Sequence, residues 1–438
     1  MKIAMATLGC KVNQSDAATL AAELAAQGHE IVSSRSVADV YILHTCTVTQ
    51  KADYQSRQLI RRAIRQNPSG KIIITGCYAQ TQPEVLKAIP GVDWIVGVGE
   101  QEKIPVFVDR REKQQKAQVI SSAIEEVRSF REERDPLFGK RNRAYLKVQD
   151  GCNSFCSYCI VPYTRGRNRS LPWERALSRV QALCASGFQE IILTGIHLGT
   201  YGEDLIPPRS LADLLPAMEG ENTGLRLRLS SIEPREVTPQ LIAYLSRSKI
   251  VCPHLHIPLQ SGDDGVLQRM NRDYSSVFFE GLVNRLIAAI PGLAIGIDVI
   301  GGFPGEDDRA FQNTVNFIER LPIAYLHVFP FSKRKGTKAA SFPEPVPSQT
   351  IKARCQVLRD LGGTKRRAFY QAFLGKKVKV LVESRDRDGG FWKGYSPNYI
   401  PVLIRTNNAS LVNQQFAVEL IEIEGDRVWG VPIKCEDS

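Results

Sequence analysis

Residues 145–159 read YLKVQDGCNSFCSYC, and this stretch places three cysteines within eight residues directly after an apolar run of strand length. Thiolates spaced so closely on one loop can converge on a single metal centre, and soft sulfur ligands select zinc or iron–sulfur clusters. A zinc site would need a fourth ligand, usually another cysteine or histidine nearby, and none follows closely. Three ligands leave one iron of a four-iron cluster open, as a catalytic cluster requires. We therefore predict an iron–sulfur cluster on Cys152, Cys156 and Cys159.

Outward from this loop, strand-like and helix-like segments alternate over residues 141–368. One helical stretch places Phe311, Val315 and Ile318 on a single face, which is typical of a helix packed on a sheet. Strands that alternate with helices form parallel sheets, and six of them suit a partial or complete β/α barrel. The strands are expected at Tyr145–Val148, Glu190–Leu193, Leu225–Leu229, His254–Ile257, Ala294–Ile300 and Tyr325–Phe329.

Residues 1–110 show the same alternation and predict an open α/β domain. Its strands are expected at Lys2–Leu8, Val40–His44 and Lys71–Thr75. One helix is expected to begin with Ser15 as its N-cap, and another to run from about Asp53 to residue 66. Residues 111–140 carry mixed charge and are expected to form a linker.

A second set of three cysteines is dispersed along the first domain. Cys10, Cys46 and Cys77 each follow the carboxyl end of an expected parallel strand. These strand ends share one edge of an open α/β sheet, where ligands bind. A single free cysteine is often an inert core residue, but three at equivalent strand ends favour a second metal site. The other four cysteines lack such a pattern and are interpreted as structural: Cys184, Cys252, Cys355 and Cys435.

Residues 371–438 have a different composition and predict a small all-β barrel. Strands are expected at Lys377–Val382, Pro401–Ile404 and Phe416–Ile423, with turn signals at 389–390 and 407–408. Nine basic and nine acidic residues give this segment no net charge. Any attraction for phosphate there is expected to be local, through lysines, or through base stacking on exposed aromatic rings. The candidates are Lys376, Lys377, Lys379, Phe391, Trp392 and Tyr395, of which the aromatic rings can equally be barrel core.

The whole chain has a net charge of +11 and a pI near 9.1, which favours an anionic partner such as nucleic acid. The longest apolar run, Leu286–Ile297, is too short to span a bilayer and contains a proline. The N-terminus carries no pattern of a signal peptide. We expect a cytoplasmic protein, in which ten cysteines are ligands or nucleophiles rather than disulfides.

The Cys-x3-Cys-x2-Cys spacing resembles the signature of radical S-adenosylmethionine (SAM) enzymes. Together with the three upstream cysteines it resembles the methylthiotransferase family over essentially the whole chain. The resemblance implies a cluster-binding N-terminal domain, a radical SAM core and a C-terminal TRAM domain. Four segments are similar to the branch that acts on threonylcarbamoyladenosine in tRNA: 13–16 (NQSD), 44–49 (HTCTVT), 193–199 (LTGIHLG) and 230–234 (SSIEP). His44 departs from the asparagine common there, and is interpreted either as neutral packing or as a tuner of the first cluster.

This family implies two [4Fe-4S] clusters, two molecules of SAM per turnover, and transfer of a methylthio group to C2 of the adenosine at position 37 in the tRNA anticodon loop. Tyr158 resembles the aromatic residue that lies near the SAM adenine. Gly301 and Gly302 belong to a stretch similar to the glycine-rich segment beside SAM, although an ordinary strand-to-loop turn would read the same way. Glu233 is expected either to bind a hydroxyl of SAM or substrate, or to be an exposed loop carboxylate.

Positive charge gathers around the cysteine loop. Residues 141–179 contain eight basic residues and two acidic ones. The sequence TRGRNR at 164–169 cannot form one helical face and is interpreted as a turn that contacts RNA phosphates. Arg165, Arg167 and Arg169 are therefore the predicted substrate-binding residues, and a second basic cluster lies at 333–335.

Three other functions compete with this interpretation. Two of them are methylthiotransferases that would carry the same clusters but modify isopentenyladenosine in tRNA or a side chain of a ribosomal protein. A non-catalytic RNA-binding module held together by metal is the third, and the incomplete coordination of both cysteine sets argues against it. The sequence does not identify the sulfur donor, the electron donor or the oligomeric state.

Overall fold

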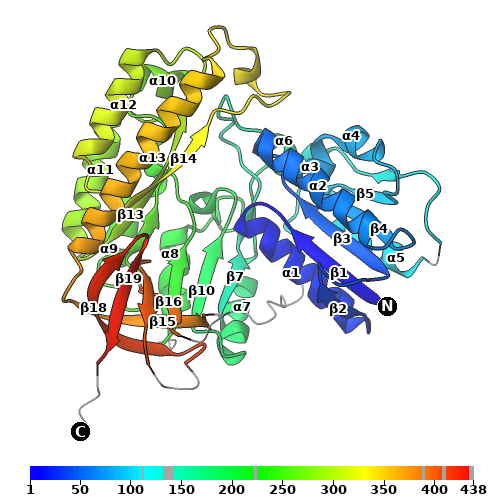
Figure 1. Ribbon diagram of the computed structural model, residues 1–438, viewed down its shortest axis with the longest axis horizontal. Helices are drawn as coiled ribbons and strands as arrows, with labels where there is room; N and C mark the ends of the chain where they lie inside the picture. The colour runs from blue at the N-terminus through cyan, green and yellow to red at the C-terminus, as the bar shows by residue number, and fades with distance from the viewer. Residues whose placement is uncertain (111, 132–141, 221–223, 387–389, 407–410, 434–438) are drawn as a thin grey trace.

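The computed structural model describes residues 1–110, 112–131, 142–220, 224–386, 390–406 and 411–433. The N-terminal domain is a six-stranded parallel sheet in the order β2-β1-β3-β4-β5-β6 (Figure 1). The three expected strands are confirmed as the centre of this sheet, and their apolar side chains form its buried core. The strands are β1 Lys2–Thr7, β2 Glu30–Ser33, β3 Val40–Thr45, β4 Lys71–Gly76, β5 Trp94–Val96 and β6 Gln118–Ile120.

Two helix predictions for this domain differ from the structure. Helix α1 (Lys11–Ala26) begins one turn earlier than expected, with Cys10 as its N-cap. Ser15 is buried inside this helix and donates a hydrogen bond to the carbonyl of Tyr145 (3.3 Å), so it faces the central domain. Helix α2 (Gln50–Gln66) begins after Thr49, whose hydroxyl accepts from the backbone N–H of Ala52. The remaining helices are α3 Cys77–Thr81, α4 Pro83–Lys87 and α5 Ile104–Asp109.

The expected linker contributes to the first domain. Strand β6 lies within residues 111–140 and pairs with β5, so the sheet extends past residue 110. Its three residues are too short a pattern to distinguish from the charged sequence around them. A short 3₁₀ turn (Ile124–Glu126) follows, and residues 132–140 of the expected linker lie outside the described part of the chain.

The central domain confirms all six expected barrel strands as two three-stranded parallel sheets, β11-β10-β7 and β12-β13-β14. Isolated bridges such as Ser231 to His256 join the two sheets into a partial barrel. Strands β7 and β14 are its edges, and helix α1 packs beside β7 (Figure 1). The strands are β7 Arg143–Lys147, β10 Glu190–Thr194, β11 Arg226–Leu229, β12 His254–His256, β13 Ala294–Gly301 and β14 Tyr325–Pro330.

Helices cover the outside of this barrel and bury its largest core. The apolar run 286–297 is divided between the end of α11 and the start of β13, which explains its length. No helix in the described residues is both long and apolar enough to cross a membrane. The helices are α6 Val161–Arg165, α7 Trp173–Ala185, α8 Leu211–Glu219, α9 Pro239–Leu245, α10 Asp264–Arg269, α11 Ser276–Ala289, α12 Asp308–Arg320 and α13 Ser348–Gln371.

The C-terminal segment forms a closed five-stranded barrel in the order β15-β16-β17-β19-β18, below the central domain in Figure 1. Trp392 is buried in its core, so this ring is unavailable for stacking on a base. Arg228 attaches this barrel to the central domain by donating to the carbonyl of Pro397 (2.8 Å). The expected turns at 389–390 and 407–408 lie wholly or partly outside the described residues. The strands are β15 Lys377–Arg385, β16 Trp392–Tyr395, β17 Pro401–Ile404, β18 Gln415–Glu424 and β19 Arg427–Pro432.

Candidate functional site

The loop that carries Cys152, Cys156 and Cys159 leaves the barrel after β7 and the short strand β8 (Gln149–Asp150). Gly151 has φ +78°, and a Cβ at this position would clash with the carbonyl of Arg167, so the turn requires glycine. The backbone N–H of Cys159 donates to the carbonyl of Cys156 (2.9 Å), which curls the loop on itself. All three cysteines are partly exposed, so the loop is accessible from one side.

Two cationic side chains reach the sulfur atoms of this loop. The Nδ1 atom of His197 lies 3.3 Å from the Sγ of Cys152, and Arg272 donates to the Sγ of Cys156 (3.2 Å). Burial raises the pKa of Cys152, but the hydrogen bond and charge of His197 and the hydrogen bonds from Ser154 together outweigh it, and the net pKa is lowered. Burial raises the pKa of Cys156, and the charge of Arg272 opposes this shift. The two cations therefore favour thiolates, the form that binds metal.

The second cysteine set meets at one sheet edge, as expected. Cys10 follows β1, Cys46 follows β3 and Cys77 begins α3 directly after β4. A Cβ on Gly9 would lie only 3.1 Å from the Sγ of Cys46, so the backbone beside Cys10 closely approaches this sulfur. Asn13 lies beside these cysteines, with its Oδ1 atom 4.0 Å from the Sγ of Cys77. Cys46 and Cys77 are buried and Cys10 is exposed, which leaves this set accessible from one side.

The spacing of the sulfur atoms distinguishes a cluster from a single zinc ion. Thiolates bound to one zinc at about 2.3 Å would lie about 4 Å from one another. In the described residues, no three cysteine sulfur atoms lie within 4.8 Å of one another. Thiolates that bind different irons of a cluster are further apart than ligands of one ion. Neither cysteine set is therefore arranged around a single zinc ion.

A cavity of about 200 Å³ joins the N-terminal domain to the cysteine loop of the central domain. Val48 and Thr49, just after Cys46, line it together with Tyr158 and Cys159. The two domains are held together at this point by polar contacts. Arg334 of the central domain pairs with Asp53 (2.8 Å) and donates to the hydroxyl of Thr47 (2.6 Å), and the backbone N–H of Gln50 donates to Ser332 (3.0 Å).

Two of the residues predicted to contact SAM border this loop. Tyr158 lines the cavity and packs edge-on against Phe303, with ring centroids 6.5 Å apart. Glu233 forms an ion pair with Arg272, the residue that contacts Cys156, and caps the short turn at Pro234–Glu236. Glu233 is thus not a free loop carboxylate, because its charge is paired with that of Arg272.

Gly301 and Gly302 lack side chains for a reason that the sequence does not reveal. A Cβ on Gly301 would lie 3.0 Å from the Sγ of Cys355, and one on Gly302 would clash with Ile351. Both Cys355 and Ile351 belong to α13, which packs against the end of β13. Gly302 also has φ +80°, and its N–H donates to the carboxylate of Glu306 (3.1 Å). The close approach that requires glycine here is that of helix α13.

The prediction that three arginines contact RNA phosphates is wrong for two of them. Arg165 is fully buried, where it pairs with Asp16 (2.8 Å) and Asp150 (3.1 Å) and donates to Asn13. Arg169 is also buried and donates to the carbonyl of Arg167 (2.9 Å). Only Arg167 is exposed. A fully buried guanidinium without a partner would be very costly, and the carboxylates on both sides of the domain boundary supply the partners for Arg165.

His44 is buried, and its Nε2 atom lies 2.9 Å from the side-chain nitrogen of Gln101. Burial lowers the pKa of His44 to about 4, so the ring is neutral at physiological pH. A neutral ring fits both interpretations of His44, packing and tuning of the first cluster. Residues that the sequence did not single out include His197 and Arg272, because nothing in the sequence places them beside the cysteine loop.

Comparisons with known proteins match both the N-terminal domain and the central domain to known families. Residues 2–97 match an uncharacterised protein family, UPF0004, and residues 146–318 match the radical SAM superfamily. The threonylcarbamoyladenosine tRNA methylthiotransferase MtaB of Bacillus subtilis is 41% identical, with 92% of this chain and 90% of that protein covered. MtaB of Aquifex aeolicus is 38% identical (88% and 94%), and the tRNA-2-methylthio-N(6)-dimethylallyladenosine synthase of Moorella thermoacetica is 33% identical (86% of each).

Solved structures with a similar fold are much more distant in sequence. The radical SAM methyltransferase TsrM from Kitasatospora setae superimposes with a TM-score of 0.55 at 15% identity, over 75% of this chain and 72% of that one. The cobalamin-dependent radical SAM enzyme OxsB gives a TM-score of 0.51 at 13% identity, over 85% and 56%. At such identities the likeness concerns the fold alone.

Proposed function

The chain belongs to the radical SAM tRNA methylthiotransferases, and on this premise we propose that it converts N6-threonylcarbamoyladenosine at position 37 of tRNA to its 2-methylthio derivative. Five relatives named for this substrate are 34–41% identical, whereas three named for dimethylallyladenosine are 31–34% identical. The sequence ranking supports the threonylcarbamoyl substrate over the isopentenyl one.

The shared cavity is the observation on which the proposed reaction depends. A methylthio transfer needs a sulfur carrier and a radical source that face one substrate atom. Residues adjoining Cys46 and residues of the loop ending at Cys159 line the same cavity of about 200 Å³. A non-catalytic RNA-binding module would have no use for two incompletely ligated metal sites whose neighbouring residues share one cavity.

In this proposal Cys10, Cys46 and Cys77 hold one [4Fe-4S] cluster and Cys152, Cys156 and Cys159 hold the other. Two clusters and two molecules of SAM per turnover supply the radical chemistry, the sulfur and the methyl group when bound. The protein positions these groups. His197 and Arg272 favour the thiolate forms of Cys152 and Cys156, as their 3.3 Å and 3.2 Å contacts indicate.

Other residues shape the cavity and bind the substrate. Tyr158 forms part of the cavity wall beside the cysteine loop, where it would support the SAM adenine. Arg167 is exposed on the same loop region and would contact a phosphate of the anticodon stem-loop. The ion pair between Arg334 and Asp53 would keep the two cluster sites at a fixed separation. A tRNA substrate and cysteines that act as ligands rather than disulfides support a cytoplasmic location.

Mass spectrometry of tRNA nucleosides tests the proposed function. A strain that lacks the gene should accumulate threonylcarbamoyladenosine and lose its 2-methylthio derivative. The wild-type chain and Cys184→Ala, a half-buried cysteine of α7 outside both sets, should restore the derivative. Cys77→Ala should not restore it.

Two outcomes would redirect the proposal. Loss of 2-methylthio-isopentenyladenosine instead would assign the chain to the other tRNA substrate. Unchanged tRNA nucleosides, with a mass change in a ribosomal protein, would assign it to the protein-modifying branch.

A further inference from the structure

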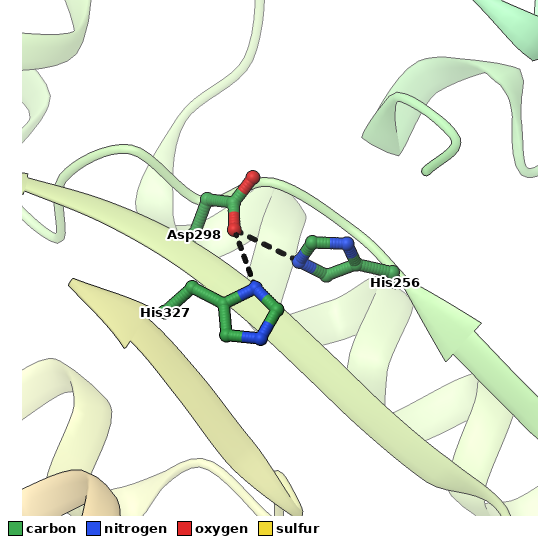
Figure 2. A group of neighbouring side chains, drawn as sticks. All are labelled: His256, Asp298 and His327. Carbon is green, nitrogen blue, oxygen red and sulfur yellow. Dashed lines mark ion pairs between the residues drawn. The ribbon is translucent and has the colours of Figure 1, made fainter. Parts of the chain in front are cut away.

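Three potential metal ligands converge on the inner face of the barrel. His256 ends β12, Asp298 lies in the middle of β13, and His327 lies opposite Asp298 on β14. Figure 2 shows the two imidazole rings directed at the same carboxylate oxygen. The Oδ1 atom of Asp298 lies 2.9 Å from Nε2 of His256 and 3.3 Å from Nδ1 of His327. All three ligand atoms lie within 4.8 Å of one another.

The short contact between His256 and Asp298 suits two ligands of one metal ion. Nε2 of His256 and Oδ1 of Asp298 are both buried and lie 2.9 Å apart. Two ligand atoms bound at 2.0–2.2 Å to one metal, at angles between about 90° and 110°, lie roughly 2.8–3.6 Å apart. Both measured distances fall in this interval.

The second nitrogen of His256 is already supported in the way that metal-binding histidines require. Its Nδ1 atom lies 2.9 Å from the hydroxyl of Ser231, which can accept the ring proton there. This tautomer leaves the lone pair of Nε2 directed at Asp298 and His327. Such a hydrogen bond on the distal nitrogen accompanies nearly all histidine ligands, because it fixes the tautomer and the ring orientation.

We propose that His256, Asp298 and His327 bind one divalent first-row transition-metal cation. Two imidazoles and one carboxylate suit zinc, iron(II) or manganese(II), and three protein ligands leave coordination positions open. Asp298 also lines the cavity that contains Cys159, so the open positions are available to a ligand in that cavity. This site uses nitrogen and oxygen donors, and it is therefore separate from the two cysteine sets. The competing interpretation is an ion pair of one carboxylate with two imidazoliums.

Titration with Mn²⁺ distinguishes the two interpretations, because Mn²⁺ prefers oxygen and nitrogen ligands to thiolates. The full chain is reconstituted anaerobically with its clusters, and free Mn²⁺ is counted from its electron paramagnetic resonance signal. We expect one Mn²⁺ per chain, displaced by Zn²⁺. Asp298→Asn and His327→Ala should each weaken binding at least tenfold. His29→Asn, which removes the histidine of a remote pair with Asp109, should bind as the wild type does.

The proposal is overturned if the wild-type chain leaves all Mn²⁺ free, or if Asp298→Asn and His327→Ala bind Mn²⁺ as tightly as the wild type. The visible absorption of the clusters reports whether each variant is folded. If both ligand variants misfold, Ser231→Ala serves instead. It removes only the support of the His256 ring and should weaken Mn²⁺ binding about tenfold, and wild-type affinity would then contradict the proposal.

Discussion

Replacing Arg165 by alanine should loosen the contact between the first two domains rather than weaken RNA binding. The guanidinium is fully buried and pairs with Asp16 of α1 (2.8 Å) and with Asp150 (3.1 Å). Removing one partner of a buried ion pair costs about 3–5 kcal/mol, because the other charge stays buried. Lys147 remains 2.5 Å from Asp16 and 3.7 Å from Asp150. The expected cost is therefore at the lower end, about 3 kcal/mol.

Hydrogen–deuterium exchange of α1 measures this cost where it arises. Since every 1.4 kcal/mol is tenfold in an equilibrium constant, the protected amides of α1 should exchange on the order of a hundredfold faster in Arg165→Ala. The matched control is Arg167→Ala, which changes an exposed arginine two residues away and should leave this exchange unaltered. Adding Asp16→Asn to Arg165→Ala should restore part of the protection, because it removes one uncompensated charge.

The reasoning about Arg165 is refuted if α1 exchanges at the wild-type rate in Arg165→Ala while tRNA affinity and its salt dependence both fall. That result would mean that Arg165 is accessible to phosphate in solution, as the sequence alone suggested.

Three other substitutions test separate parts of the structure. Arg167→Ala should reduce the slope of log affinity for tRNA against log salt by about 1, as expected for one lost phosphate contact, and an unchanged slope would remove Arg167 from the interface. Gly302→Ala should lower the melting temperature because it strains a positive φ and crowds α13, whereas Gly363→Ala, in open space on that helix, should not; equal melting temperatures would contradict this account. Arg228→Met should leave the buried Glu190 with only the longer contact to Arg143 (3.9 Å) and make the C-terminal barrel more sensitive to limited proteolysis, and wild-type resistance would show that Arg228 does not hold the barrel.

The fold and the cysteine sets were predictable because their signals are local or periodic. Each barrel strand is a short apolar run bounded by turns. Such runs can be recognised as strands from the sequence without tertiary information. Cys10, Cys46 and Cys77 could be grouped because the carboxyl ends of parallel strands share an edge. Short edge strands such as β6 were not predicted, because three residues are too few to show an alternation of apolar and polar side chains.

The partners of charged residues were not predictable in the same way. Arg165 and Asp16 are 149 residues apart, and only the docking of α1 against the barrel brings them together. A cluster of arginines in sequence looks the same whether its charges face solvent or buried carboxylates. The group of His256, Asp298 and His327 likewise comes from three strands, and nothing in the sequence indicates that these three side chains meet.

Iron and sulfide counted per chain after anaerobic reconstitution test the central claim most directly. The account predicts about eight irons in the wild type. It predicts about four when Cys10, Cys46 and Cys77 are all replaced by alanine, and about four when Cys152, Cys156 and Cys159 are replaced. Zinc in place of iron, or an iron content that either triple substitution leaves unchanged, would contradict it.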